Sequence, residues 1–366
     1  MLLFSCDLDT RVINTVHRDG SVTRKVIMKG GKDSVFDPEF YRVPVDSSWT
    51  MVESCEIGEE NDTTWILTAE KWFAGVDEIN QDYMNDSGTN RILERSAHFT
   101  KSFRWFINVY RFSERVETIL DAEVPASEFL DEEELKFYYM PDQGRQELFN
   151  SPDSVRFRDL EERVDSLAEI WTWTAFVRQW IDLFYEQAGN DPGLKITREE
   201  MMALTPMFIR QLLDYDIWDP HVEGESEGMD GKDNSEEDAG DQDLWNVIVP
   251  VLGKEFYRTY SAVIDSAGAV LETMLEPFFG TSDYDVEIRM PGRITGSNGY
   301  AVADPDSAMN ESMLWKVTSE YFLTMPYEMW VESRESNYWA WIVTAVFLVF
   351  VIFGLLLRRS RKMDRS

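Results

Sequence analysis

The last part of the chain contains an uninterrupted apolar segment that is long enough to cross a lipid bilayer. Residues 338–357 have the sequence YWAWIVTAVFLVFVIFGLLL, which is 20 residues without an acidic or basic side chain. A helix of this length, at a rise of about 1.5 Å per residue, spans the roughly 30 Å hydrocarbon core of a membrane. Tyr338, Trp339 and Trp341 stand at its start, where aromatic side chains commonly lie at a membrane interface. The segment therefore predicts a single transmembrane helix.

A run of basic residues follows this segment at once and predicts its orientation. Arg358 and Arg359 open a tail, residues 358–366, that carries five Lys and Arg side chains. Because basic flanks remain on the cytoplasmic side of a membrane, the tail is predicted to be cytoplasmic and the chain before Tyr338 to lie outside. The predicted location is therefore the inner, or cytoplasmic, membrane, with one span and an extracytoplasmic N-terminal part.

The first residues resemble the end of an export signal. The tetrapeptide LFSC, ending at Cys6, resembles a bacterial lipobox, in which an apolar, a variable and a small residue precede the cysteine that is acylated. A complete signal peptide needs a basic start and a longer apolar stretch, so we expect residues 1–6 to be the remnant of a signal that begins further upstream. Cys6 is the predicted lipidation site. In some bacteria an aspartate directly after the acylated cysteine, here Asp7, retains a lipoprotein in the inner membrane. The alternative is an ordinary cytoplasmic N-terminus with a chance cysteine.

The composition is strongly acidic, with a net charge of −33. This charge argues against nucleic acid as a partner, because nucleic-acid binding needs a basic surface, and against lying flat on anionic lipid. Aromatic residues make up 13% of the chain, which is enough for a substantial core. There are two cysteines. If Cys6 is acylated, Cys55 has no disulfide partner; if it is not, the two could form a bridge outside the cell.

Residues 7–120 form the first β-rich segment. Runs rich in Val, Ile and Thr at 10–17 and 22–29 flank an Asp-Gly pair, which favours a tight hairpin turn because glycine accepts a positive φ. Further strands are predicted at 49–55, 64–69 and 97–112. The last of these alternates apolar and polar residues and is predicted to be one continuous strand.

Residues 121–280 change to a helical periodicity. The strongest helix is predicted at 159–187, where apolar residues form a near-continuous stripe. Residues 219–243 are rich in Gly, Ser, Asp and Glu and predict a disordered acidic loop. A calcium site in this loop is disfavoured because the acidic residues do not have the spacing of a calcium-binding loop. We therefore predict neither a metal nor a cofactor.

Residues 281–337 return to β-strands and complete a predicted α+β fold. The simplest arrangement is an antiparallel β domain built from the N- and C-terminal segments, with the helices inserted between them and one transmembrane helix at the end. Two separate β modules are the alternative.

Three features of the β segments resemble the LppM-type domain of bacterial envelope lipoproteins. They are a strand–Asp-Gly-Ser–strand hairpin at 16–25, a Pro-Gly-x-apolar-x-x-Ser-Asn-Gly segment at 291–299, and an apolar-Trp strand at 314–317 that leads to the C-terminal helix. The resemblance leaves out the helical middle. It implies a non-catalytic envelope domain that contacts lipid. From the residues alone, Gly292 and Gly299 are predicted to be positions that need a positive φ.

We predict no catalytic residue. The three histidines do not stand at metal-binding spacing. Adjacent carboxylates such as Glu161 with Glu162, or Glu199 with Glu200, could serve glycoside hydrolysis, which uses two carboxylates. With 68 acidic residues in the chain, however, such pairs are expected on solvated helix faces.

The aromatic residues of the 159–187 helix allow two interpretations. Trp173, Phe176 and Trp180 add to the main apolar stripe, so the helix is either buried between two layers or offers a partner- or lipid-binding surface. We predict a membrane-anchored, non-catalytic binding or scaffold module of a bacterial envelope complex, with an envelope protein as partner and lipid at Cys6 and at the span. The alternatives are an envelope hydrolase, a lipid-binding lipoprotein and a receptor, although the short tail of a receptor would need a partner helix.

Overall fold

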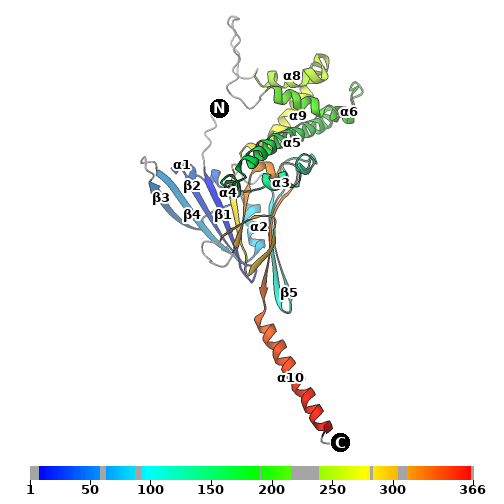
Figure 1. Cartoon of the computed structure of the whole chain (residues 1–366). Helices are drawn as coiled ribbons and strands as arrows, with labels where there is room; N and C mark the ends of the chain where they lie inside the picture. The colour runs from blue at the N-terminus through cyan, green and yellow to red at the C-terminus, as the bar shows by residue number, and fades with distance from the viewer. Residues whose placement is uncertain are drawn as a thin grey trace.

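The computed structural model describes residues 8–57, 63–86, 93–189, 191–215, 239–280, 283–303 and 311–363. Two β-sheets form the middle of the molecule, a group of helices stands at one end, and the last helix, α10 (Tyr338–Met363), leaves from the opposite end (Figure 1). The chain is thus a mixed α and β protein with sheets that are mainly antiparallel, as predicted.

The larger sheet has seven strands in the order β3-β4-β2-β1-β7-β10-β9. They are β1 (Asp9–Val16), β2 (Val22–Gly30), β3 (Thr50–Ile57), β4 (Thr63–Phe73), β7 (Tyr284–Arg289), β9 (Tyr300–Ala303) and β10 (Glu311–Val317). β1 and β7 run parallel, and the other neighbours run antiparallel. The predicted first hairpin is confirmed, because β1 pairs with β2 and Gly20 takes a φ of 95° in the turn.

The smaller sheet has four strands in the order β5-β6-β11-β8. They are β5 (Arg95–Arg104), β6 (Ile107–Val116), β8 (Arg293–Ser297) and β11 (Tyr327–Ser336). The prediction of one continuous strand over 97–112 is wrong, because the chain reverses at Trp105 and Phe106 and forms the β5–β6 hairpin. No typical turn residue marks this reversal. Trp105 itself adopts a positive φ of 22°, which Gly or Asn would normally supply.

Both sheets combine strands from the two ends of the chain. In the larger sheet Val12 of β1 aligns with Val286 of β7, and in the smaller sheet Phe112 of β6 aligns with Val331 of β11. The helices between β6 and β7 therefore lie, in the sequence, between early and late strands that pair with one another, β1 with β7 and β6 with β11. The early and late strands depend on one another for their backbone partners.

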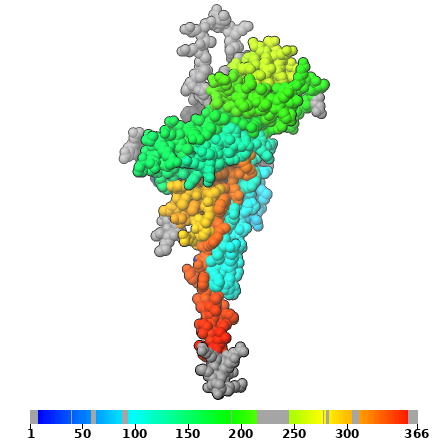
Figure 2. Space-filling model, turned by 45° about the vertical axis from the view of Figure 1, so that its right-hand side comes forward, coloured from blue at the N-terminus to red at the C-terminus, as the bar shows by residue number. Residues whose placement is uncertain are grey.

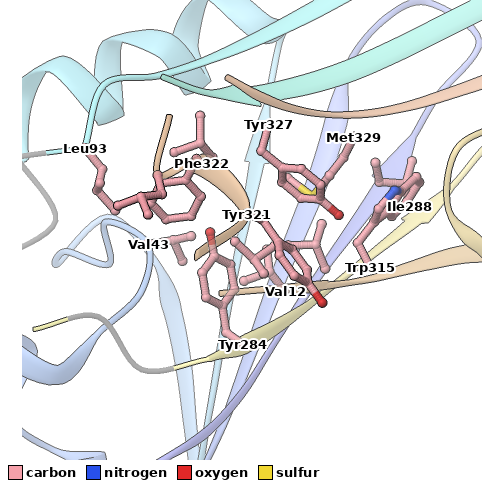
Figure 3. Close-up of a cluster of buried hydrophobic side chains, with 14 of the residues drawn as sticks. Val12, Val43, Leu93, Tyr284, Ile288, Trp315, Tyr321, Phe322, Tyr327 and Met329 are labelled. Atoms are coloured by element: carbon pink, nitrogen blue, oxygen red, sulfur yellow. The ribbon is translucent and has the colours of Figure 1, made fainter. Parts of the chain in front are cut away.

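The two sheets face each other across a shared apolar core. Trp315 and Ile288 of the larger sheet and Tyr327 and Met329 of the smaller one point into it, as Figure 3 shows. Side chains in β2 alternate between buried and half-buried positions, the period expected for a strand with one face against a core. This core packs the two sheets against each other.

The helices beyond the sheets form a second packed group, the helical lobe. Its helices are α3 (Glu132–Tyr138), α4 (Asp142–Phe149), α5 (Ser154–Ala188), α6 (Arg198–Met202), α7 (Thr205–Tyr215), α8 (Ala239–Leu252) and α9 (Lys254–Gly280). Two further helices, α1 (Lys32–Val35) and α2 (Val76–Asn85), lie among the strands. The long predicted helix at 159–187 is confirmed within α5, which contacts both α7 and α9.

The predicted acidic loop at 219–243 needs a correction at its C-terminal end. The backbone of residues 239–243 belongs to α8, so the helix begins earlier than the composition suggested. The remainder of that predicted loop lies outside the described residues. Pro250 is accommodated inside α8. The chain leaves helical geometry at Gly253, where φ is 89°, and again at Tyr260 inside α9, where φ is −114° and ψ is 15°.

Two glycines of the 291–299 segment are held by close packing. Gly292 has a φ of 80°, as predicted, and a Cβ there would clash with the carbonyl oxygen of Arg334. The prediction of a positive φ at Gly299 is wrong. A side chain is excluded there because the indole of Trp315 would lie 2.5 Å from its Cβ.

Candidate functional site

The predicted membrane anchor forms a helix that is almost free of contact with the rest of the protein. The part Tyr338–Leu356 of α10 is long and apolar enough to cross a membrane, and 6% of it is buried in the molecule. Tyr338, Trp339 and Trp341 lie exposed in its first turn. Arg358 and Arg359 lie in the helical backbone near its end, and Cys6 lies outside the described residues.

The tip of the β5–β6 hairpin packs against the start of α10. We call the five aromatic side chains that meet here the tip cluster: Phe103, Trp105, Phe106, Trp339 and Trp341. Phe103 stacks on Trp339 with ring centroids 6.0 Å apart, and Trp105 meets the same indole edge-on at 5.6 Å. Phe106 lies 4.3 Å from Trp341 between ring centroids. The cluster thus links the smaller sheet directly to α10.

Polar contacts fix the same junction. The indole N–H of Trp105 donates a hydrogen bond of 3.0 Å to the hydroxyl of Thr344, inside the apolar part of α10. Asn337, the residue before α10, donates from its side chain to the carbonyl of Trp105 at 3.1 Å and to Asn108 at 3.4 Å. The backbone N–H of Asn337 also donates to the carbonyl of Phe106 at 2.8 Å. These hydrogen bonds therefore restrain the position of α10 relative to β11 and the hairpin tip.

An open cleft of about 920 Å³ lies at the end of the larger sheet beside the β1–β2 turn. It is lined by Thr15, Val16, His17, Arg18, Asp19, Ser21, Trp72, Arg289, Met290 and Pro291. Trp72 stands at the cleft with 60% of its surface exposed. Arg18 forms an ion pair with Glu335, close to the end of β11, so the cleft opens at the same end of the molecule as α10.

The charges around this cleft are paired. Arg289 donates to Glu287 at 2.7 Å, and Glu287 also accepts from Arg11 at 2.8 Å. Hydrogen bonds from the hydroxyl and amide of Ser21 lower the pKa of Asp19, the carboxylate among the lining residues. His17 contacts the Thr23 hydroxyl at 2.9 Å. The cleft therefore offers a mixed polar and aromatic wall rather than a pair of carboxylates.

A buried polar cluster joins the two sheets. Arg24 of β2 forms an ion pair with Glu114 of β6, and their side chains are only 2% and 8% exposed. Asn14 accepts from Arg24 at 2.7 Å and donates to Glu114 at 3.4 Å, while the guanidinium of Arg24 also donates to the hydroxyl of Tyr83 at 2.7 Å. Burial raises the pKa of that hydroxyl, so Tyr83 stays neutral. Every member of the cluster has a partner, which makes it a structural link between the sheets.

The half-buried carboxyl group of Asp285 has a raised pKa. Burial raises the pKa of Asp285 on β7 to about 6, and the nearby charges of Asp9 and Asp142 add to the effect. Asp285 lines neither the cleft described above nor a second groove of about 610 Å³ between α5 and α7. The carboxylate pairs considered from the sequence lie on helices, where Glu162 is exposed and Glu200 completes the N-terminal cap of α6.

The suggestion that Trp173, Phe176 and Trp180 form a surface is wrong for this structure. Their exposed fractions are 8%, 5% and 7%. Phe176 meets Phe278 of α9 edge-on at 5.5 Å, and Trp180 meets Phe208 of α7 at 5.9 Å. The other interpretation, a helix buried between two layers, accounts for them.

The sequence did not point to the tip cluster or to the cleft. A signal for the tip cluster was present, because Phe103-Arg104-Trp105-Phe106 is an aromatic run, but the alternating pattern around it favoured a continuous strand. The cleft has no local signal, since its walls come from β1, β4 and β7.

Comparisons with known proteins give no further identification. Among the described residues, no group of three or more His, Cys, Asp or Glu side chains is placed to hold a metal ion. No family model matches the chain, and neither a curated protein nor a solved structure matches it. The likeness to the LppM-type domain stays a prediction.

Proposed function

We propose that this chain is a single-pass, membrane-anchored binding or scaffold module of a bacterial envelope, with its sheets and helical lobe outside the cytoplasmic membrane and its basic tail in the cytoplasm. The observation that carries the proposal is the exposed apolar surface of α10. Of the part Tyr338–Leu356, 6% is buried, and an apolar helix without protein cover is stable in lipid rather than in water. The tail charges favour the stated orientation.

The proposed architecture is one β domain that carries a helical insertion. Support comes from the pairing of β1 with β7 and of β6 with β11, since a module cut from either end of the chain would lose these partners. The insertion would then extend from the end of the β domain opposite α10 (Figure 1). A protein anchored at one end in this way has its lobe free to reach an envelope partner.

A binding role, rather than catalysis, suits the chemistry of the cleft. Asp19 is hydrogen-bonded to Ser21, Arg18 to Glu335, and Arg289 to Glu287, so these groups hold each other in place. Trp72 adds an exposed aromatic face, a residue type that is common at binding surfaces. The proposed ligand is an envelope protein that docks at this membrane-proximal cleft.

Site-specific photo-crosslinking in native membranes tests the binding role. A benzophenone amino acid in place of Trp72, in the full chain, is expected to give a discrete protein adduct after illumination. The matched control replaces Met84 of α2, which is 76% exposed but does not line the cleft. A lipid adduct at position 72 would point instead to a lipid-binding protein. The same adducts at both positions, or none at either, would contradict a partner at the cleft.

Two further experiments test the anchoring. Protease added to intact spheroplasts should digest the chain before Tyr338 and spare an epitope placed after Lys362; loss of that epitope would contradict the orientation. Expressed with a complete lipoprotein signal peptide fused before the LFSC segment, the chain should incorporate labelled fatty acid, and Cys6→Ser should abolish the label. Continued labelling of Cys6→Ser would overturn acylation at Cys6 without affecting the proposed span.

A further inference from the structure

We propose that the tip of the β5–β6 hairpin is a second membrane-contacting element, which inserts its aromatic side chains into the interfacial region of the bilayer that α10 enters. The inference rests on the proposed function, because it requires α10 to cross a membrane. The occupant of the exposed side of the tip cluster is then the lipid that surrounds α10 itself.

The depth of the hairpin follows from its register. Ile107, at the start of β6, pairs with Ser336 at the end of β11, so the tip residues lie beyond the last strand residue before α10. Trp105 reaches Thr344, which is six residues past the first residue of α10. At a helical rise of about 1.5 Å per residue, this places the Trp105 indole roughly 9 Å along α10. Interfacial aromatic residues lie at the ends of a membrane-spanning helix, so the Trp105 indole lies at the depth of this aromatic belt or deeper in the bilayer.

The outer faces of the tip cluster are uncovered by protein. Phe103 is 55% exposed and Trp105 is 47% exposed, although each contacts Trp339. Figure 2 shows the hairpin, in cyan, running down beside the end of β11 to the first turns of α10. Of the two side chains, Trp105 combines an apolar ring with a polar N–H, a type of side chain that is favoured at membrane interfaces. In this proposal lipid covers the aromatic surface of Phe103 and Trp105 that the protein leaves exposed.

The charge of the hairpin fits this position. Residues 95–113 contain no acidic residue, although the chain has 68 of them and a net charge of −33. The same stretch carries Arg95, Lys101, Arg104 and Arg111. Lys101 and Arg104 are exposed near the tip, where long basic side chains can reach phosphate groups while their stems lie against apolar surface. An acid-free segment can approach anionic lipid that the rest of this surface would repel.

The backbone of the turn also departs from ordinary hairpin chemistry. Trp105 adopts a positive φ of 22°, a region that a bulky side chain seldom occupies. Gly, Asn or Asp would form such a turn at lower cost. An aromatic residue at this position destabilises the turn but makes contacts with α10 and with lipid. Such contacts can offset the backbone strain at a tip that inserts into a membrane.

Depth-dependent fluorescence quenching tests the inference in the full chain. In a Cys6→Ser, Cys55→Ser background, an environment-sensitive fluorophore is attached at Ser102→Cys, which is exposed at the tip and leaves every aromatic residue in place. The chain is placed in nanodiscs of phosphatidylcholine and phosphatidylglycerol, either without nitroxide lipids or with lipids that carry a nitroxide near the headgroup or deep in the acyl chains. Thr100→Cys is the matched site, about 7 Å further from the tip on the same side of β5. Phe347→Cys in α10 and Met207→Cys in the helical lobe are the remaining labels.

The headgroup nitroxide is expected to quench the label at Ser102→Cys more strongly than the label at Thr100→Cys. Both should be quenched several-fold more strongly than the label at Met207→Cys. Adding Phe103→Ser and Trp105→Ser to the Ser102→Cys chain should reduce the quenching at 102, while thermal melts check that the fold is kept. If Phe347→Cys is quenched by nitroxides placed deep in the acyl chains and Ser102→Cys behaves like Met207→Cys, the hairpin stands clear of the bilayer and the inference is wrong. If Phe347→Cys itself is not quenched, the proposed span fails and the inference fails with it.

Discussion

Two aromatic groups of this protein have opposite surroundings. On α5, Trp173, Phe176 and Trp180 lie in a core between α7 and α9, with less than a tenth of each side chain exposed. In the tip cluster, about half of Phe103 and of Trp105 remains exposed beside α10. Aromatic content alone therefore does not separate a core from a contact surface. What separates them is whether another layer of the protein covers the residues.

The largest expected effect tests the buried side of this comparison. Trp180→Ala should lower the free energy of unfolding by roughly 3–5 kcal/mol, because it leaves a cavity against Phe184 and Phe208. Chemical denaturation of the full chain in detergent measures the change. Trp72→Ala is the control, since an exposed Trp should cost no more than about 1 kcal/mol. Equal losses of unfolding free energy at the two positions would contradict the burial of Trp180 in a core.

The second prediction extends the comparison to the sheets that carry the hairpin. Arg24→Met should destabilise by roughly 3 kcal/mol, because it leaves the Glu114 carboxylate buried without its ion-pair partner. Asn14 and Tyr83 still donate to that carboxylate, which holds the loss near the lower end of the usual range. Adding Glu114→Gln removes the buried charge and should restore much of the loss. A double variant no more stable than Arg24→Met would show that the charge is not the cause.

A smaller effect depends on pH. The pKa of Asp285 is raised from 3.8 to about 6 in the folded protein, so the unfolded chain ionises first as the pH rises. The contribution of the protonated acid is complete below about pH 4 and is lost as the pH rises through about 6. Asp285→Asn should therefore stabilise by about 1–2 kcal/mol at pH 7.5, a figure reduced for partial exposure, and have little effect at pH 4. Thermal melts at both pH values measure it, and an equal effect of Asp285→Asn at pH 4 and at pH 7.5 would contradict it.

The smallest expected effect tests the exposed side of the comparison. Trp105→Ala should change the free energy of unfolding in detergent by no more than about 1 kcal/mol, because the side chain is half exposed and fills no protein core. Denaturation under the conditions used for Trp180→Ala allows a direct comparison. A loss as large as that of Trp180→Ala would mean that the tip cluster is itself a core and that lipid has no part in it.

Local patterns in the sequence determined the elements whose residues carry their own instructions. The uncharged segment after Tyr338 predicted α10, the Asp-Gly pair predicted the β1–β2 turn, and the apolar stripe from Leu160 predicted α5. In each case the preference lies in neighbouring residues, whether through helix length, glycine backbone freedom or a 3.6-residue period.

Tertiary structure decided everything that depends on distant contacts. The reversal at Trp105 and Phe106 lacks a local turn residue. It is held by Asn337, just before α10, and by Trp339 and Thr344 of α10, more than 200 positions away. The burial of Trp180 depends on helices α7 and α9 folding over α5. The raised pKa of Asp285 needs the neighbouring strands to exclude water. A sequence pattern records which side chains are apolar, but only the packed chain decides which of them another layer covers.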